Sequence, residues 1–150
     1  MSHVANVEVE INSLTSLEQA CKNLGLKFKK GQKTYKWYGK FMNDWHTQDA
    51  AVNNGYDPET FGKCEHAISV PNAEYEVGVV LSKGSKSYRL IYDTFGNGKE
   101  IARQLGGVHL PILKREYAVA VATKQLAMKG YGVSRTVTKD GQIKITGMKA

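Results

Sequence analysis

The sequence contains few cysteines and no long apolar stretch. Only two cysteines, Cys21 and Cys64, occur among 150 residues, which excludes a framework of several disulfides. No apolar run approaches the roughly 18 residues that a membrane-spanning helix needs. The alternating N-terminus lacks the apolar block of a secretory signal. These absences predict a cytoplasmic protein with no membrane segment.

Acidic residues are also scarce relative to basic ones. The chain has 21 Lys and Arg against 14 Asp and Glu, a net charge of +7. Residues 27–41, KFKKGQKTYKWYGKF, contain six lysines and no acid, so without them the count is 15 against 14. Most of the excess charge therefore lies in one tenth of the sequence. Such a balance favours nucleic acid, nucleotides or acidic proteins as partners.

Hydrophobic periodicity predicts the elements of the N-terminal third. Apolar and polar residues alternate over residues 4–11, as in a half-buried strand. Ser13 or Thr15 can cap a helix that follows, and Gly25 ends it. Residues 26–30 and 33–41 are then predicted as two strands around a Gly31-Gln32 turn.

The rest of the chain is predicted as a long loop followed by strands and one long helix. Residues 43–65 form the loop, with a short helix near residues 47–52. Strands follow at residues 66–70, 74–82 and 87–94, and the segment FGNGKE is predicted as a glycine-rich loop. A helix over residues 110–129 leads to a last hairpin of residues 132–138 and 142–147 around Asp140-Gly141.

This order of elements predicts an α+β fold in a single domain, residues 1–150. An antiparallel sheet would carry two helices packed on it. Each helix ends in glycine and leads into a predicted hairpin whose turn contains Gly-Gln. The similarity suggests two related helix–hairpin halves, residues 1–42 and 66–150, joined by the loop.

The basic segment is the strongest candidate for a binding site, and two interpretations of it stay open. Tyr35 and Trp37 alternate with Lys36, so both rings should lie on one face of a strand. If that face is exposed, the rings can stack on bases while lysines attract phosphates. If it is buried, the rings belong to the core and the lysines protect an edge strand. The predicted ligand contacts are Lys29, Lys30, Lys33, Tyr35, Lys36, Trp37 and Lys40.

Catalytic and metal-binding patterns are weak. His46 with Asp49 has no accompanying ligand spacing, so no metal site is predicted. Cys64 and His66 are two residues apart and could share a strand face as a dyad, but no third group orients the histidine. The segment GNGKE is not a phosphate-binding loop motif, although its amides could form a small anion nest. No cofactor and no catalytic residue is predicted.

Three stretches together resemble the hypothetical chloroplast reading frame thirty-five family, whose members occur in cyanobacteria, other bacteria and phages. The stretches are MSH with SLEQACKNLG, then EYEVGVVLSKGSKSYRLIYDTFG, then LKREYAVAVATKQLAMKGYGVSRTVTKDGQIKI. Relatives begin the late helix with a Gln-Arg-Tyr-Ala-like stretch, whereas this chain has Arg115-Glu116-Tyr117-Ala118. The resemblance implies a small α+β protein of unassigned role, and it transfers no catalytic residue. The phage members make a viral role one of the alternatives.

The sequence therefore favours a non-enzymatic binding protein for a phosphate-bearing ligand. That ligand would be nucleic acid or a nucleotide, including a cyclic nucleotide signal if the protein is viral. The alternative is a protein-interaction module, such as an adaptor or a phage-encoded inhibitor of a host protein. A homo-oligomer is compatible with both, and an enzyme using Cys64, His66, His46 and Asp49 is the least favoured hypothesis.

Overall fold

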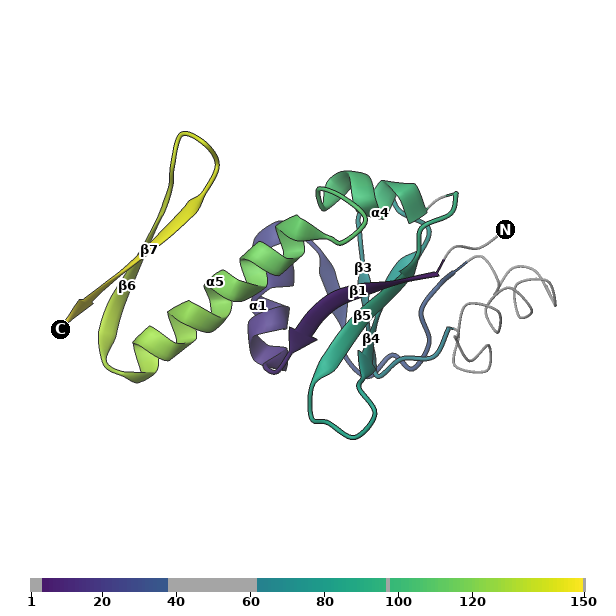
Figure 1. Ribbon diagram of the computed structural model, residues 1–150, viewed down its shortest axis with the longest axis horizontal. Helices are drawn as coiled ribbons and strands as arrows, with labels where there is room; N and C mark the ends of the chain where they lie inside the picture. Colours follow the sequence, from purple (N-terminus) through teal and green to yellow (C-terminus); the bar gives the residue numbers. More distant parts are fainter. Residues whose placement is uncertain (1–3, 38–61, 97, 150) are drawn as a thin grey trace.

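The computed structural model describes residues 4–37, 62–96 and 98–149. In chain order the elements are β1 (Val4–Ile11), α1 (Leu14–Leu24), β2 (Lys27–Lys29), β3 (His66–Ser69), β4 (Glu76–Leu81), β5 (Tyr88–Asp93), α4 (Gly98–Gln104), α5 (Pro111–Met128), β6 (Tyr131–Val137) and β7 (Ile143–Lys149). The first five strands form an antiparallel sheet in the order β1-β5-β4-β3-β2 (Figure 1). Strands β6 and β7 form a separate antiparallel hairpin. The predicted α+β class is confirmed.

Helix α1 has the boundaries that its end residues dictate. Ser13 is the N-cap, and its Oγ accepts a hydrogen bond from the backbone N–H of Ser16 at 3.3 Å. Gly25 ends the helix in the left-handed region at φ 73°, which glycine adopts without strain. These caps end α1 within two residues of β1 on one side and of β2 on the other, as the sequence predicts.

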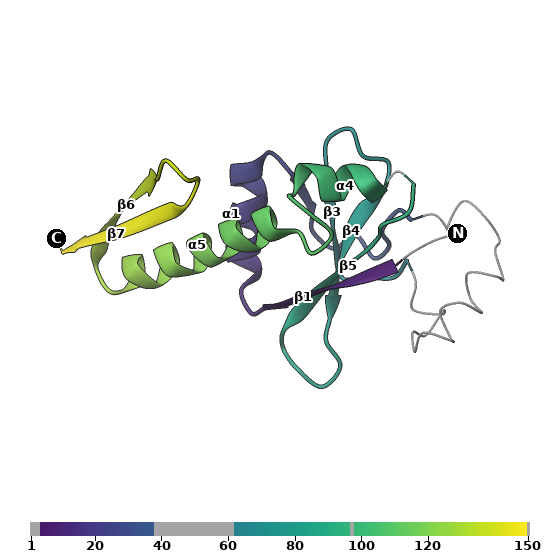
Figure 2. The same cartoon turned by 45° about the horizontal axis from the view of Figure 1, so that its top comes forward.

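One face of the sheet carries the main hydrophobic core, and all three described helices contribute to it. Along β5, successive side chains point to opposite faces of the sheet, and Leu90 and Tyr92 point into this core. The helices add Leu17 of α1, Ile101 of α4 and Leu113 of α5, each with 0% exposure. Figure 2 shows the helices gathered on this side of the sheet.

The opposite face of the sheet is covered by an irregular segment that contains Tyr35. Tyr35 is 0% exposed and packs with Cys64, Ala67 and Ile91 in a second, smaller core. Its ring lies directly on Gly78 of β4, where an added Cβ would be 2.6 Å from Tyr35 Cδ1. The sheet can accept the ring only because this strand position has no side chain.

Helix α5 connects the body of the protein to the C-terminal hairpin. It begins with Pro111 in the first helical turn, where the missing N–H costs nothing. The hydroxyl of Tyr117 accepts hydrogen bonds from the backbone N–H groups of Asn12 at 2.9 Å and Ser13 at 3.2 Å, which fixes the helix to the β1–α1 junction. Beyond Ala120 no residue of α5 is buried. Figures 1 and 2 place the hairpin against α5, at the end of the molecule farthest from the five-stranded sheet.

The structure corrects three expectations about local elements. The predicted hairpin of residues 26–30 and 33–41 does not form, because β2 pairs with β3 and the described part of the second strand makes only an isolated bridge, Thr34 to Lys63. The first helix therefore leads into no hairpin, unlike α5, so the predicted helix–hairpin repeat is not formed. The segment predicted as a glycine-rich loop instead contains the short helix α4. The helix predicted near residues 47–52 lies outside the described residues.

Candidate ligand-binding surface

Lys29 is held by a buried carboxylate and does not face a ligand. Glu76 is 2% exposed, and Lys29 Nζ donates to its Oε2 at 2.7 Å. Gln32 Nε2 and the backbone N–H of Lys36 each donate to Oε1 at 3.0 Å. Burial on its own raises the pKa of Glu76, but the hydrogen bonds from Lys29, Lys36 and Gln32 outweigh it and leave the pKa lowered. Glu76 thus fixes the basic segment onto β4 as a charged carboxylate.

The two aromatic side chains of the basic segment belong to the second core. Tyr35 is fully buried, so its ring offers no face for a base, and the predicted stacking role of Tyr35 does not agree with this position. Trp37 is half-buried and packs against the same cluster. Both rings do lie on one side of the segment, as their alternation with Lys36 predicts. The core interpretation of these aromatics fits their burial better than the stacking interpretation.

The remaining lysines of the segment are exposed and are joined by one that is distant in sequence. Lys30, Lys33 and Lys36 are all exposed, and Lys40 lies outside the described residues. Lys63 is also exposed, and the bridge Thr34 to Lys63 and the bond from Cys64 N to Lys33 O at 2.9 Å bring it beside the segment. Lys30, Lys33, Lys36 and Lys63 are called the lysine patch below. No sequence pattern could identify Lys63, because its pairing depends on how the intervening chain returns.

His66 lies next to the lysine patch, and its pKa responds to the positive charge of the patch. Burial lowers the pKa of His66, and the positive charge of Lys33 and then that of Lys30 lower it further, while Glu65 opposes them. The backbone N–H of Gly31 donates to Nδ1 of His66 at 2.9 Å, which favours the neutral ring. Within the described part of the patch, only Lys30 has an ion pair, with Glu18 at 3.9 Å. Glu65 and Glu18 oppose this positive field, and among the described residues the four lysines of the patch outnumber these two acids.

The Cys64–His66 dyad, which the sequence left as a weak possibility, is not assembled. Cys64 is buried in the second core, and its Sγ donates to the backbone carbonyl of Gln32 at 3.2 Å. Burial raises the pKa of Cys64 to about 12, so the thiol stays protonated at neutral pH. The ring of His66 instead contacts Phe28 and Tyr88. His46 and Asp49 lie outside the described residues, and within the described ranges no three His, Cys, Asp or Glu side chains gather as metal ligands would.

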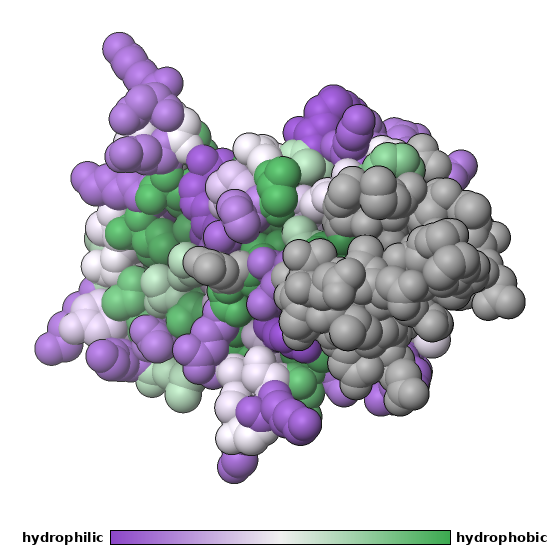
Figure 3. All heavy atoms as spheres, turned by 45° about the vertical axis from the view of Figure 1, so that its right-hand side comes forward, coloured by the Kyte–Doolittle hydropathy of each residue, from purple (hydrophilic) through white to green (hydrophobic). Residues whose placement is uncertain are grey.

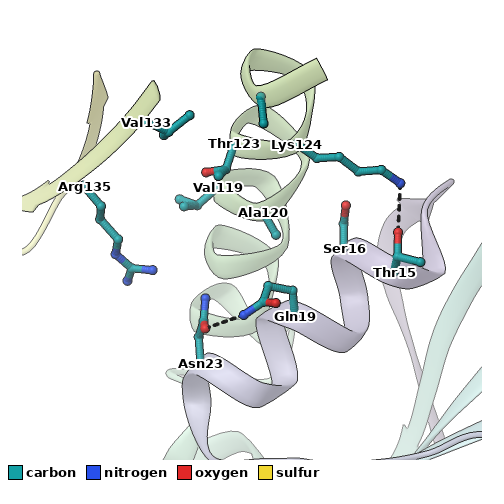
Figure 4. Close-up of a pocket in the computed structure, with 11 residues that line it drawn as sticks. Thr15, Ser16, Gln19, Asn23, Val119, Ala120, Thr123, Lys124, Val133 and Arg135 are labelled. Carbon is teal, nitrogen blue, oxygen red and sulfur yellow. Dashed lines mark hydrogen bonds between the residues drawn. The ribbon is translucent and has the colours of Figure 1, made fainter. Parts of the chain in front are cut away.

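A groove of about 570 Å³ lies between α1, α5 and the hairpin. Figure 4 shows Val133 and Arg135 of β6 on one side of it, Gln19 and Asn23 of α1 on the other, and α5 between them. Lys124 crosses from α5 to α1, where its Nζ donates to Thr15 Oγ1 at 2.9 Å. No local sequence pattern indicates this groove, because the residues of α1 and α5 that line it are at least 96 positions apart (Asn23 to Val119).

Comparisons with protein-family models, with curated proteins and with solved structures find no match to this chain. The family resemblance noted in the sequence thus remains a prediction, and no residue role is transferred from a relative. No helix in the described parts of the chain combines the length and apolar character needed to cross a membrane.

Proposed function

We propose that this chain is a non-enzymatic binding protein for a phosphate-bearing ligand, a nucleotide or nucleic acid. The lysine patch carries the proposal, because it brings together four exposed lysines and, among the described residues, the only ion pair that any of them makes is the loose one from Lys30 to Glu18. Lysine ammonium groups bind phosphate as point charges without a fixed fork geometry. The ion pair of half-buried Lys29 with buried Glu76 holds the basic segment on β4 and leaves Lys29 out of the free charge of the patch.

A nucleotide on the lysine patch should be detectable at His66. A bound phosphate neutralises the field of Lys33 and Lys30, so it should raise the pKa of His66 toward the ordinary value. The test is an NMR titration of the His66 ring with and without saturating cyclic AMP, or with a 20-nucleotide single strand. The same samples give affinities at several KCl concentrations. The absorbance ratio at 260 and 280 nm of the purified protein, before and after a high-salt wash, shows whether a ligand is retained.

Matched variants separate binding at the patch from general charge attraction. Lys30→Gln with Lys33→Gln removes two charges from the patch and should abolish both the pKa response and most of the salt-dependent affinity. Lys83→Gln with Lys99→Gln removes two exposed charges from the β4–β5 turn and α4 and should change neither. The patch would be rejected as the site if the two double variants lose affinity equally, or if no phosphate ligand changes the pKa of His66.

The second candidate function is a protein-interaction module, and the exposed apolar side chains of the α5–hairpin end favour it. Met128 is 79% exposed and Met148 is 67% exposed. Methionine surfaces of this kind adapt to varied partners. Capture of a defined protein after nuclease treatment, lost on Met128→Ser with Met148→Ser, would favour this module over the phosphate-binding protein.

A further inference from the structure

The C-terminal arm, which comprises α5 and the β6–β7 hairpin, is a second concentration of positive charge besides the basic segment of residues 27–41. Residues 111–150 contain eight Lys and Arg and two acidic residues, a net charge of +6. Residues 1–110 contain thirteen Lys and Arg and twelve Asp and Glu, a net charge of +1. Of the two acids in the arm, Glu116 is buried against Arg135 and Asp140 bonds Thr138 at the hairpin turn. The arm is therefore a compact polycation attached to a nearly neutral body.

One face of the hairpin is fixed against α5. Arg135 donates to both carboxylate oxygens of Glu116, at 2.9 Å from Nη1 to Oε2. Arg115 Nη1 donates to the backbone carbonyl of Gly141 in the turn at 3.1 Å. At the other end, Gly147 approaches Leu126 so closely that an added Cβ would be 3.2 Å from it. These contacts hold the ribbon against α5.

The other face of the hairpin is exposed and mostly polar. Ser134 pairs with Thr146 and Thr136 with Lys144 on this face, and Met148 lies beside them. Lys139 projects at the turn, and in Figure 3 the hairpin tip at the upper left ends in hydrophilic side chains. Hydroxyl and ammonium groups of this kind are typical donors to phosphate and to base edges.

Two grooves lie between the ribbon and the helices, on the face opposite to Ser134 and Thr146, and each contains a basic side chain. The groove of Figure 4 separates β6 from α1 and contains Lys124. A second groove, of about 460 Å³, runs along β7 and is lined by Arg115, Ile143 and Ile145. The second groove also contains Asp140, so these basic groups add to the positive potential of the arm but are not themselves contacts for a ligand on the outer face.

We propose that the outer face of the β6–β7 hairpin binds duplex DNA, with the ribbon in the major groove. The major groove of B-form DNA is about 12 Å wide and admits a two-stranded ribbon. Single strands are usually bound on aromatic platforms, and the described outer face presents hydroxyls, lysines and a methionine without an aromatic ring. The deep, narrow major groove of duplex RNA excludes side chains, and a second copy of the +6 arm would be repelled.

This inference rests on the proposed phosphate-binding function but assigns a different surface and a defined ligand class. The test measures fluorescence anisotropy of a labelled 20-base-pair DNA duplex with the full chain between 50 and 200 mM KCl. Lys139→Gln with Lys144→Gln should weaken binding and make the slope of log K against log salt shallower by about two, roughly one for each lost phosphate contact. Lys83→Gln with Lys99→Gln should leave the slope unchanged.

Three outcomes would overturn the inference. No duplex binding at 50 mM KCl, tighter binding to single-stranded DNA or to duplex RNA of the same length, or equal slopes for the two double variants would do so. The patch variant Lys30→Gln with Lys33→Gln distinguishes the two proposals. If that variant keeps duplex binding but loses the His66 response to nucleotide, each surface has its own ligand. If only the hairpin variant has an effect, the lysine patch is rejected and the DNA surface stands.

Discussion

At the scale of single residues, Glu76 shows how one buried acid decides the role of a basic segment. Sequence analysis treated Lys29 as one of several equivalent phosphate contacts. The carboxylate of Glu76 removes it from that set, because Lys29 Nζ lies 2.7 Å away and Glu76 is buried. The acid is 47 residues away in the sequence, so charge patterning within the segment could not reveal it. Lys30, Lys33 and Lys36, by contrast, are exposed, as most lysines in proteins are, and so keep their place among the proposed phosphate contacts.

Glu76 should also make folding stability depend on pH. The pKa of Glu76 is lowered in the folded state, so the unfolded chain takes up the proton first. The contribution is fully present above the ordinary pKa of 4.5 and is lost as the pH falls below it toward the folded value. Glu76→Gln should remove this acid-side slope and lower stability at pH 7 by about 1.5–3 kcal/mol, the usual effect of losing hydrogen bonds to a charged group.

Urea unfolding at several pH values between 3 and 7 measures both effects. Glu10→Gln, which changes an exposed carboxylate on β1, is the matched control and should keep the slope of the wild type. If Glu76→Gln retains that slope as well, another acid is responsible and the role assigned to Glu76 is wrong.

At the scale of elements, the regular strands and long helices were predictable, whereas their irregular connections were not. Alternation and capping predicted β1, α1, the β4–β5 hairpin, α5 and the β6–β7 hairpin, since each is specified by local sequence. The partner of β2 was missed because Gly31, at φ 77°, forms a real turn that does not lead back along β2. Helix α4 was missed because its first residue, Gly98, looks like a loop glycine. That glycine is required by packing, since a Cβ there would be 1.6 Å from the carbonyl oxygen of Asp93.

The contact between the Tyr35 segment and β4 gives a prediction at the same scale. Gly78→Ala should destabilise the protein by about 1–3 kcal/mol, because the added methyl group overlaps the buried Tyr35 ring. Gly132→Ala in β6 is the matched control. Its nearest neighbour, the carbonyl oxygen of Met148, would be at 3.6 Å, an ordinary contact distance. Thermal unfolding of both variants tests this, and an equal effect of the two substitutions would argue against close packing of the ring on β4.

At the scale of the whole molecule, the body and the arm differ in what stabilises them. The body has a continuous core between the sheet and the three helices. Among residues 121–149, the described part of the arm beyond Ala120, none is fully buried. It relies instead on the Glu116–Arg135 pair, the bond from Arg115 to Gly141 and the contact of Leu126 with Gly147. Segments with few buried contacts open at lower free energy than the core.

We therefore expect Arg135→Ala to release the hairpin without unfolding the body. The substitution leaves the buried carboxylate of Glu116 without its partner. Losing hydrogen bonds to a charged group costs about 1.5–3 kcal/mol, so amide exchange in β6 and β7 should accelerate by about 10- to 100-fold. Amides of β4 and β5 should keep the exchange rates of the wild type in hydrogen–deuterium exchange. Replacing both partners, as Glu116→Leu with Arg135→Leu, should restore much of the protection because no charge is then left buried. Equal acceleration of amide exchange in the hairpin and the sheet would instead show that arm and body unfold as one cooperative unit. The position of the hairpin would then depend on the core and not on this ion pair.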